Sequence, residues 1–303
     1  MSAARLLSST VKRPRVCLVV GAGAGIGVNV ARRFAQSGML SVLCRRSNQE
    51  GLDAAVQAIQ ADGGLAKGYL LDAVAPGAIE GLVERVEAEV GDIEVAVYNL
   101  GAQIGNVPLE KQTLKAFEMG WRLGCESLFR LAKSVGPRMS ARGSGCLLVT
   151  SATAAVRGNR GQHSHAAAMG GRRMLCQTLG HELGPRGVHV CHFVIDGAVD
   201  APDTLGRMLG AERFAQESAA RLDPPAFRLH VRRAAAPDLV SEGWAFESLP
   251  CQLRAERGDG LLQPAHVAET YHHVATQHRS VWSNEVDLRP YTEMAWYNSN
   301  SAL

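Results

Sequence analysis

Val16–Gly27, with the sequence VCLVVGAGAGIG, is the stretch that decides the fold of this chain. Its five apolar residues predict a buried strand, and a helical pattern starts among the glycines that follow. Glycines let the backbone turn sharply and approach a pyrophosphate, while a helix N-terminus offers unpaired N–H groups to the anion. The placement between strand and helix therefore predicts a dinucleotide cradle rather than a tight turn alone. Its residues are Gly21, Gly23, Gly25, Ile26 and Gly27.

Apolar strands alternate with longer helical segments from Arg15 onward, a pattern typical of a parallel sheet covered on both faces. The predicted strands are Val16–Val20, Leu40–Cys44, Ala66–Leu71, Ile93–Tyr98, Cys146–Thr150, His189–Ile195 and a final edge strand at Val281–Leu288. Helical spacing predicts helices over Ala78–Val90, Thr113–Met139, Gln162–Gly184 and Pro264–Gln277. We therefore predict an α/β doubly wound Rossmann fold, with a mostly parallel sheet and helices on both faces.

Composition bounds the class of protein. With 46% hydrophobic and 20% charged residues, the chain is typical of a globular protein, and residues 15–303 are predicted to form one domain. Prolines interrupt the periodicity at about 222–260, which predicts a loop insertion.

The net charge is +3 and the cations are scattered, so no nucleic-acid partner is predicted. No apolar run approaches about 18 residues, so no membrane span is predicted. The seven cysteines form no C-x-x-C and are predicted to be mostly buried thiols.

The N-terminal segment, residues 1–14, is interpreted as a leader. It is rich in serine and contains basic residues but no acidic one. That composition suits a mitochondrial presequence, and the alternative is a disordered leader on a cytoplasmic protein.

Glycine spacing and later motifs narrow the family. The chain resembles the short-chain dehydrogenase/reductase family in the spacing of three glycines, Gly21, Gly25 and Gly27. Asp72 follows the third predicted strand and resembles the adenine contact of that family. The segment Tyr98-Asn99-Leu100-Gly101 follows the fourth strand and resembles another of its motifs. The resemblance implies a nicotinamide dinucleotide as the cofactor, with Asn99 and Gly101 lining its site.

The end of the second predicted strand bears on the choice of cofactor. Many NAD-binding Rossmann proteins place a carboxylate there, which accepts a hydrogen bond from the ribose 2′-hydroxyl. This chain instead has Cys44, followed by Arg45 and Arg46, whose guanidinium groups can pair with a 2′-phosphate. We therefore favour NADP(H) over NAD(H). A solvated arginine pair at the start of a helix is the alternative.

The resemblance also implies a catalytic tyrosine and lysine, which this chain lacks. In that family the tyrosine transfers a proton, and a lysine four residues later lowers the tyrosine pKa and holds the ribose. The helix predicted over Gln162–Gly184 sets the register and puts His165 at the tyrosine position and Met169 at the lysine position. A thioether carries no charge that could shift a neighbouring pKa. No tyrosine occurs between Tyr98 and Tyr271, so no shift of register restores the pair.

Three further positions of the family pattern are changed. Counting thirteen residues back from the tyrosine position puts the family's serine at Ala152. We expect neither Ser151 nor Thr153 to take over its geometry, because adjacent strand residues point to opposite faces unless a bulge intervenes. The family's asparagine falls at Gly124, and the threonine that meets the carboxamide falls at Ala201.

His165 is the one candidate for an acid at this place, because imidazole exchanges a proton near neutral pH. The alternative, which we favour, is a polar cluster without chemistry at the start of a helix, since no orienting carboxylate is adjacent in sequence. A metal site at His163 and His165 has no identifiable third ligand, so none is predicted.

Three functions fit these patterns. The favoured one is a noncatalytic NADP(H)-binding scaffold, or a subunit of a larger assembly. The second is an NADP-dependent oxidoreductase that acts on a carbonyl or an alcohol with His165 as the acid. The third is a sensor of the NADP(H) redox state. The predicted partners are the dinucleotide and other subunits, in a homo-oligomer or in a protein complex.

Overall fold

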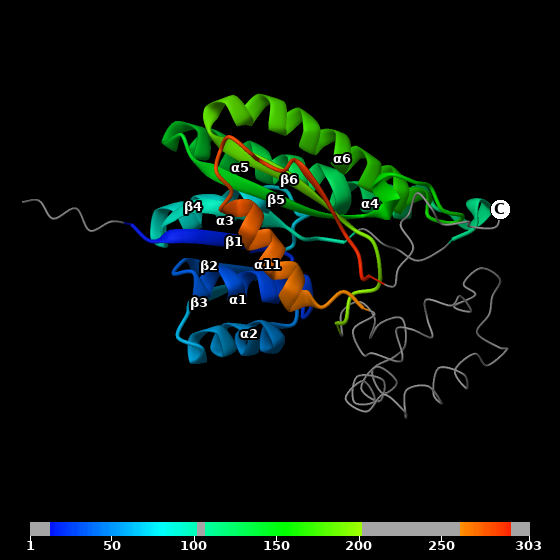
Figure 1. Cartoon of the computed structure of the whole chain (residues 1–303). Helices are drawn as coiled ribbons and strands as arrows, with labels where there is room; N and C mark the ends of the chain where they lie inside the picture. The colour runs from blue at the N-terminus through cyan, green and yellow to red at the C-terminus, as the bar shows by residue number, and fades with distance from the viewer. Residues whose placement is uncertain (1–12, 102–106, 202–260, 292–303) are drawn as a thin grey trace, which may run out of the picture.

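The computed structural model describes residues 13–101, 107–201 and 261–291. Within these ranges, seven parallel strands form one sheet in the order β3-β2-β1-β4-β5-β6-β7 (Figure 1). The strands are β1 (Arg15–Val20), β2 (Leu40–Arg45), β3 (Leu65–Leu70), β4 (Asp92–Tyr98), β5 (Gly145–Ala152), β6 (Val188–Ile195) and β7 (Glu285–Leu288). The predicted Rossmann-type α/β fold is confirmed.

Helices cover both faces of the sheet, because the strand side chains alternate between two apolar cores. Val16 and Leu18 of β1 point into one core, and Cys17 and Val19 point into the other. The first core packs against α3 (Ala78–Glu89), α5 (Ser127–Arg142) and α6 (His163–Leu183). The second packs against α1 (Ile26–Gln36), α2 (Gln49–Ala61) and α11 (Pro264–Ala275) (Figure 1). Strands buried on both faces explain the near-continuous apolar runs in the sequence.

Two helices return to the next strand through tight turns that contain a glycine. Gly38, between α1 and β2, has a φ of 85°, and Gly63, between α2 and β3, has a φ of 82°. A Cβ at either position would meet nothing within 4 Å, so the left-handed backbone alone favours glycine there. Both turns lie at the amino-terminal edge of the sheet, opposite the edge where the strands end.

The helix predicted over Thr113–Met139 is present, but it is not α-helical throughout. A π-helical turn, Arg122–Glu126, separates α4 (Leu114–Trp121) from α5. A π turn takes one residue more than an α turn, and here the Gly124 carbonyl accepts a hydrogen bond from Arg172 Nε at 2.6 Å. Apolar spacing does not reveal the interruption, because the apolar stripe continues on both sides of it.

Other predictions have mixed outcomes. The edge strand predicted over Val281–Leu288 is shorter than expected, because Val281 N–H closes a turn onto the His278 carbonyl and β7 begins later. The six described cysteines are free and buried, as predicted, and Cys251 lies outside the described residues. Most of the predicted leader and the whole predicted insertion at about 222–260 also lie outside them. In the described ranges, no helix combines the length and apolar character needed to cross a bilayer.

Candidate functional site

The glycine loop connects β1 to α1 at the carboxyl edge of the sheet, where the strand order reverses from β1 toward β4. The N–H groups of Gly21 and Ala22 donate to the Cys44 carbonyl at 3.1 and 2.9 Å, which ties the loop to the end of β2. Gly21 has a φ of 101°, and a Cβ there would lie 2.8 Å from the Asn99 backbone. A Cβ on Gly27 would collide with the Gly21 carbonyl. The backbone packing of the loop therefore requires these glycines.

The first turn of α1 forms the anion-binding part of the site. The helix begins at Ile26, and its N-cap residue, Gly25, provides no side-chain hydrogen bond. The first N–H groups of a helix have no partner within the helix. A Cβ on Gly25 would lie 2.8 Å from the Cβ of Ala201, which is fully buried. A close-packed cradle at an uncapped helix N-terminus fits the pyrophosphate of a dinucleotide. The structure brings together the predicted residues Gly21, Gly23, Gly25, Ile26 and Gly27.

Asn99 holds the glycine loop from the end of β4. Its Nδ2 donates to the Gly21 carbonyl at 2.8 Å, and its N–H donates to the Val20 carbonyl at 2.8 Å. Asn99 therefore positions the cradle. Gly101 is exposed, and a Cβ there would meet nothing within 4 Å. Direct contacts of Asn99 and Gly101 to the cofactor stay predictions.

The two arginines after Cys44 differ in their surroundings. Arg45 is half-buried at the end of β2, and its Nη1 lies so close to Gly51 of α2 that a Cβ there would collide with it. Asn48 caps α2 by accepting a hydrogen bond from the Gly51 N–H at 2.9 Å. Arg46 is exposed at the same edge of the sheet as the glycine loop. The contact of this pair with a 2′-phosphate stays a prediction.

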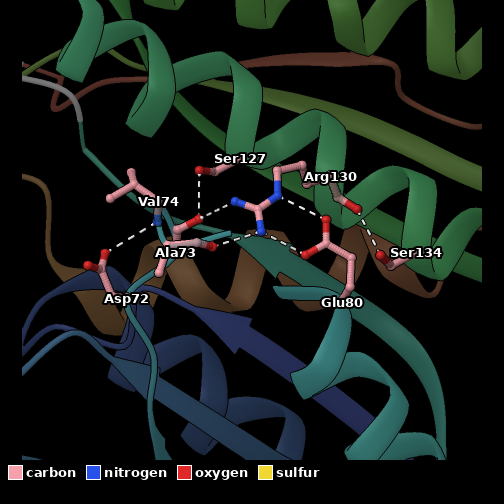
Figure 2. Close-up of polar contacts among 8 residues, drawn as sticks. Asp72, Ala73, Val74, Glu80, Ser127, Arg130 and Ser134 are labelled. Carbon is pink, nitrogen blue, oxygen red and sulfur yellow. Dashed lines mark hydrogen bonds and ion pairs between the residues drawn. The ribbon is translucent and has the colours of Figure 1, made fainter. Parts of the chain in front are cut away.

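Asp72 lies in an exposed turn that follows β3 (Figure 2). Its Oδ1 accepts a hydrogen bond from the Val74 N–H at 3.3 Å. One residue earlier, Leu71 N–H donates to the Arg45 carbonyl at 2.7 Å. The structure thus joins the Asp72 turn directly to the arginine pair at the end of β2.

The positions expected to hold the tyrosine and lysine lie on the buried side of α6. His165 is 8% exposed, and Met169, one turn later, is 1% exposed. Ser151 Oγ donates to Met169 Sδ at 3.6 Å, so the Ser151 side chain faces α6. That Ser151 does not take over the geometry of the family's serine stays a prediction. Ala152, thirteen positions before His165, follows Ser151 directly at the end of β5.

The two buried tyrosines in the described part of the chain are both engaged within the core. Tyr98 donates to the Leu123 carbonyl, and burial raises its pKa to about 12. Tyr271 of α11 is fully buried and donates to Thr150 Oγ1 at 2.9 Å, and burial raises its pKa as well. Both phenols therefore stay protonated at neutral pH.

Arg172 is a buried cation that sequence reasoning missed. Its side chain is 1% exposed and donates to the carbonyls of Gly124 at 2.6 Å, Leu100 at 2.8 Å and Thr150. The guanidinium carbon also lies 5.0 Å from the centre of the Tyr98 ring. Burial lowers the Arg172 pKa, but an arginine keeps its proton in proteins. One positive charge thus connects the ends of β4 and β5 to the π turn.

A signal for Arg172 was present in the sequence. Met169, Cys176 and Leu179 lie on the same stripe of α6 as Arg172, and all of them are buried. A cation on an apolar stripe indicates a charge with buried partners. In the described ranges, no three histidine, cysteine or acidic side chains are placed to hold a metal ion.

A parallel sheet in this strand order, with a glycine cradle at the point of reversal, defines a Rossmann-type α/β protein. A family model for short chain dehydrogenases matches residues 15–204. This chain therefore belongs to the short-chain dehydrogenase family.

Known proteins agree with this assignment. The short-chain reductase protein NovJ of Streptomyces niveus is 34% identical over 210 residues, which cover 67% of this chain and 77% of NovJ. A short-chain dehydrogenase structure from Rhodopseudomonas palustris has a TM-score of 0.66 and 26% identity, and the match covers 92% of this chain and 99% of that one. An alcohol dehydrogenase structure from Thermococcus sibiricus, complexed with 5-hydroxy-NADP, has a TM-score of 0.68 and 21% identity. That match covers 93% of this chain and 99% of the other one. At that identity the last likeness concerns the fold alone.

Proposed function

We propose that this chain binds NADP(H) without the hydride-transfer activity of its family, as a nucleotide-binding scaffold or as a subunit of a larger assembly. Met169 carries the proposal. It is 1% exposed and contacts the Ser151 hydroxyl at the position where the family has its lysine. A thioether has no charge to lower a neighbouring pKa and no proton to donate to a ribose hydroxyl. The cradle at the start of α1, by contrast, keeps the geometry that a pyrophosphate requires.

The chemistry divides between cofactor and protein. A bound nicotinamide supplies the hydride, while the protein must orient the substrate and supply or accept a proton. General acid–base catalysis contributes about 10²–10⁴-fold, so loss of the phenol and its cation should remove most turnover of the family type. Ser151 of β5 places a hydroxyl against the buried side of α6, but a hydroxyl alone orients a carbonyl and does not protonate it at neutral pH.

NADP(H) is the cofactor that the surroundings of β2 favour. A guanidinium recognises a phosphate through charge-assisted hydrogen bonds, and Arg45 and Arg46 lie where the adenosine ribose is expected. The Thermococcus sibiricus enzyme was solved with 5-hydroxy-NADP, so the fold that it shares with this chain accommodates a cofactor of the NADP type.

The decisive experiment combines binding with turnover. NADPH should bind saturably and more tightly than NADH, while a panel of carbonyls and alcohols gives no turnover above background. The double variant His165→Tyr/Met169→Lys should gain turnover, because it places both groups beside Ser151. Adding Ser151→Ala to that variant is the matched control and should remove the gain. Robust hydride transfer by the natural protein would overturn the proposal.

A second candidate is an oxidoreductase in which His165 supplies the proton. It is favoured by the position of Ser151, because the Ser151 hydroxyl contacts Met169, one turn after His165 on the buried side of α6. This function requires turnover that depends on pH. His165→Phe should abolish the turnover and keep NADPH affinity, whereas His163→Phe should retain it. An unchanged rate in His165→Phe would exclude the imidazole as the acid.

We also propose that the chain forms a homo-oligomer through α4 and α5. Leu114 and Trp121 of α4 are 81% and 43% exposed, and Phe129 of α5 is 50% exposed. Large exposed apolar side chains on two consecutive helices favour contact with another subunit. Light scattering should report an oligomer that Phe129→Glu weakens. A monomer at micromolar concentration would contradict this proposal.

A further inference from the structure

The turn that carries Asp72 is anchored to a charged pair on helices α3 and α5 (Figure 2). Arg130 of α5 donates from Nε and Nη2 to the two carboxylate oxygens of Glu80 of α3, at 2.9 and 2.7 Å. The Arg130 side chain is 13% exposed and that of Glu80 is 40% exposed. The hydrogen bond from Arg130 lowers the Glu80 pKa, so both groups are charged at neutral pH. A bidentate ion pair of this kind holds a guanidinium in one orientation.

The same guanidinium holds the backbone that follows Asp72. Its Nη1 donates to the Ala73 carbonyl at 3.2 Å, and its Nη2 donates to the Ala75 carbonyl at 2.9 Å. Ser127, one turn earlier on α5, donates from Oγ to the Ala73 carbonyl at 3.0 Å. Figure 2 shows these donors converging on the turn from one side, with the Asp72 carboxylate pointing away from them. Two peptide groups are thus fixed by side chains of a helix whose apolar face packs into the core.

We propose that Arg130 is a positioning residue for the adenosine end of the dinucleotide site, because it holds the Ala73–Ala75 backbone and thereby places Asp72. The proposal rests on the proposed binding of NADP(H). The turn is also joined to the arginine pair, through the hydrogen bond from Leu71 N–H to the Arg45 carbonyl. Arg130 therefore sets the spacing between the group that meets the adenine and the groups that meet the 2′-phosphate.

The physical basis is preorganisation. An exposed turn that becomes ordered only when a ligand binds loses affinity through that ordering. The hydrogen bonds of Arg130 are formed without ligand, so the ordering is complete before adenosine arrives. A lysine cannot do the same, because a single ammonium does not reach both Glu80 oxygens and both carbonyls in one plane.

The test separates the two halves of the dinucleotide. NADPH, 2′,5′-ADP and reduced nicotinamide mononucleotide are titrated calorimetrically against the natural protein, Arg130→Met and Arg130→Lys. In Arg130→Met, NADPH and 2′,5′-ADP should bind about tenfold more weakly, while the mononucleotide is unaffected. The affinities of Arg130→Lys for NADPH and 2′,5′-ADP should lie between those of the natural protein and those of Arg130→Met. Arg138→Met is the matched control, because Arg138 donates to Ser134 within α5 and should change none of the three affinities.

Two results would overturn the positioning role. One is unchanged affinity for 2′,5′-ADP in Arg130→Met, and the other is an equal loss for both half-ligands, which indicates general destabilisation. If Arg130→Met does not fold, Glu80→Gln gives the same comparison, with an expected loss of about threefold for the adenosine ligands only. Failure of the proposed function looks different, because the natural protein itself would then bind none of the three ligands.

Discussion

Acid should destabilise this protein through His192, a buried histidine of β6. The imidazole is 1% exposed, and its Nδ1 lies 3.0 Å from Oε2 of Glu285 on β7. Glu285 also pairs with Arg173 of α6, at 2.7 Å. Burial lowers the His192 pKa to about 4, and the attraction of Glu285 only partly opposes it. The folded protein therefore keeps this imidazole neutral at pH values where the unfolded chain protonates it.

The size of the effect follows from the two pKa values. An unperturbed histidine has a pKa of about 6.5. Because the folded value is lower, the contribution of His192 to stability is fully present above pH 6.5 and is lost as the pH falls toward its folded pKa of about 4. At about 1.4 kcal/mol per pH unit, the full loss is about 3 kcal/mol. About 2 kcal/mol of it should be lost between pH 7 and pH 5.

Urea unfolding at pH 7 and at pH 5 measures this loss. His192→Val places a strand-forming residue in line with Val190 and Val194. Between pH 7 and pH 5, the free energy of unfolding of this variant should fall by about 2 kcal/mol less than that of the natural protein. His181→Ala, at an exposed position on α6, should show the natural difference. If His192→Val loses as much stability in acid as the natural protein does, His192 is not the group responsible.

Three further predictions concern the cradle and the buried cation. Gly27→Ala should weaken NADPH binding at least about tenfold in calorimetry, because its Cβ would lie 2.9 Å from Ala22 Cα and displace the loop. Gly81→Ala, where a Cβ meets nothing within 4 Å, should bind normally. Arg46→Asp should change the ratio of the NADPH and NADH dissociation constants at least about tenfold toward NADH, and an unchanged ratio would remove Arg46 from the 2′-phosphate site. Arg172→Met should lower the free energy of unfolding in urea by about 2–4 kcal/mol, because its carbonyl partners lose a charged donor, and a loss under about 1 kcal/mol would contradict this.

The parts of the fold that were predictable are those set by short stretches of sequence. A buried strand, a glycine turn and a helix start follow each other within Val16–Gly27, so the cradle could be predicted from one motif. The parallel sheet covered on both faces then followed from the alternation of strands with helices. Asn99 was singled out as well, but its hydrogen bond to the Gly21 carbonyl, 78 positions away, is a product of the fold.

The features that were missed depend on partners that are distant in the sequence. The apolar stripe of α6 marks Arg172 as buried, but the carbonyls that it contacts are 22 and 72 positions away, and no local pattern identifies them. The π turn exists where the Gly124 carbonyl meets that guanidinium, so it could not be seen in the apolar spacing of α4 and α5. The contact between Ser151 and Met169 joins residues 18 positions apart, so no local pattern reveals it.

The glycine turns at Gly38 and Gly63 offer a route for handling the protein in experiments. They lie at the sheet edge remote from the cradle, and their surroundings leave open space around the backbone. A short peptide tag inserted at such a surface turn adds bulk far from Gly25 and Asp72, and its closure entropy grows only slowly with its length. Either turn is therefore suited to attaching a fluorophore or a surface tether for the binding measurements described above.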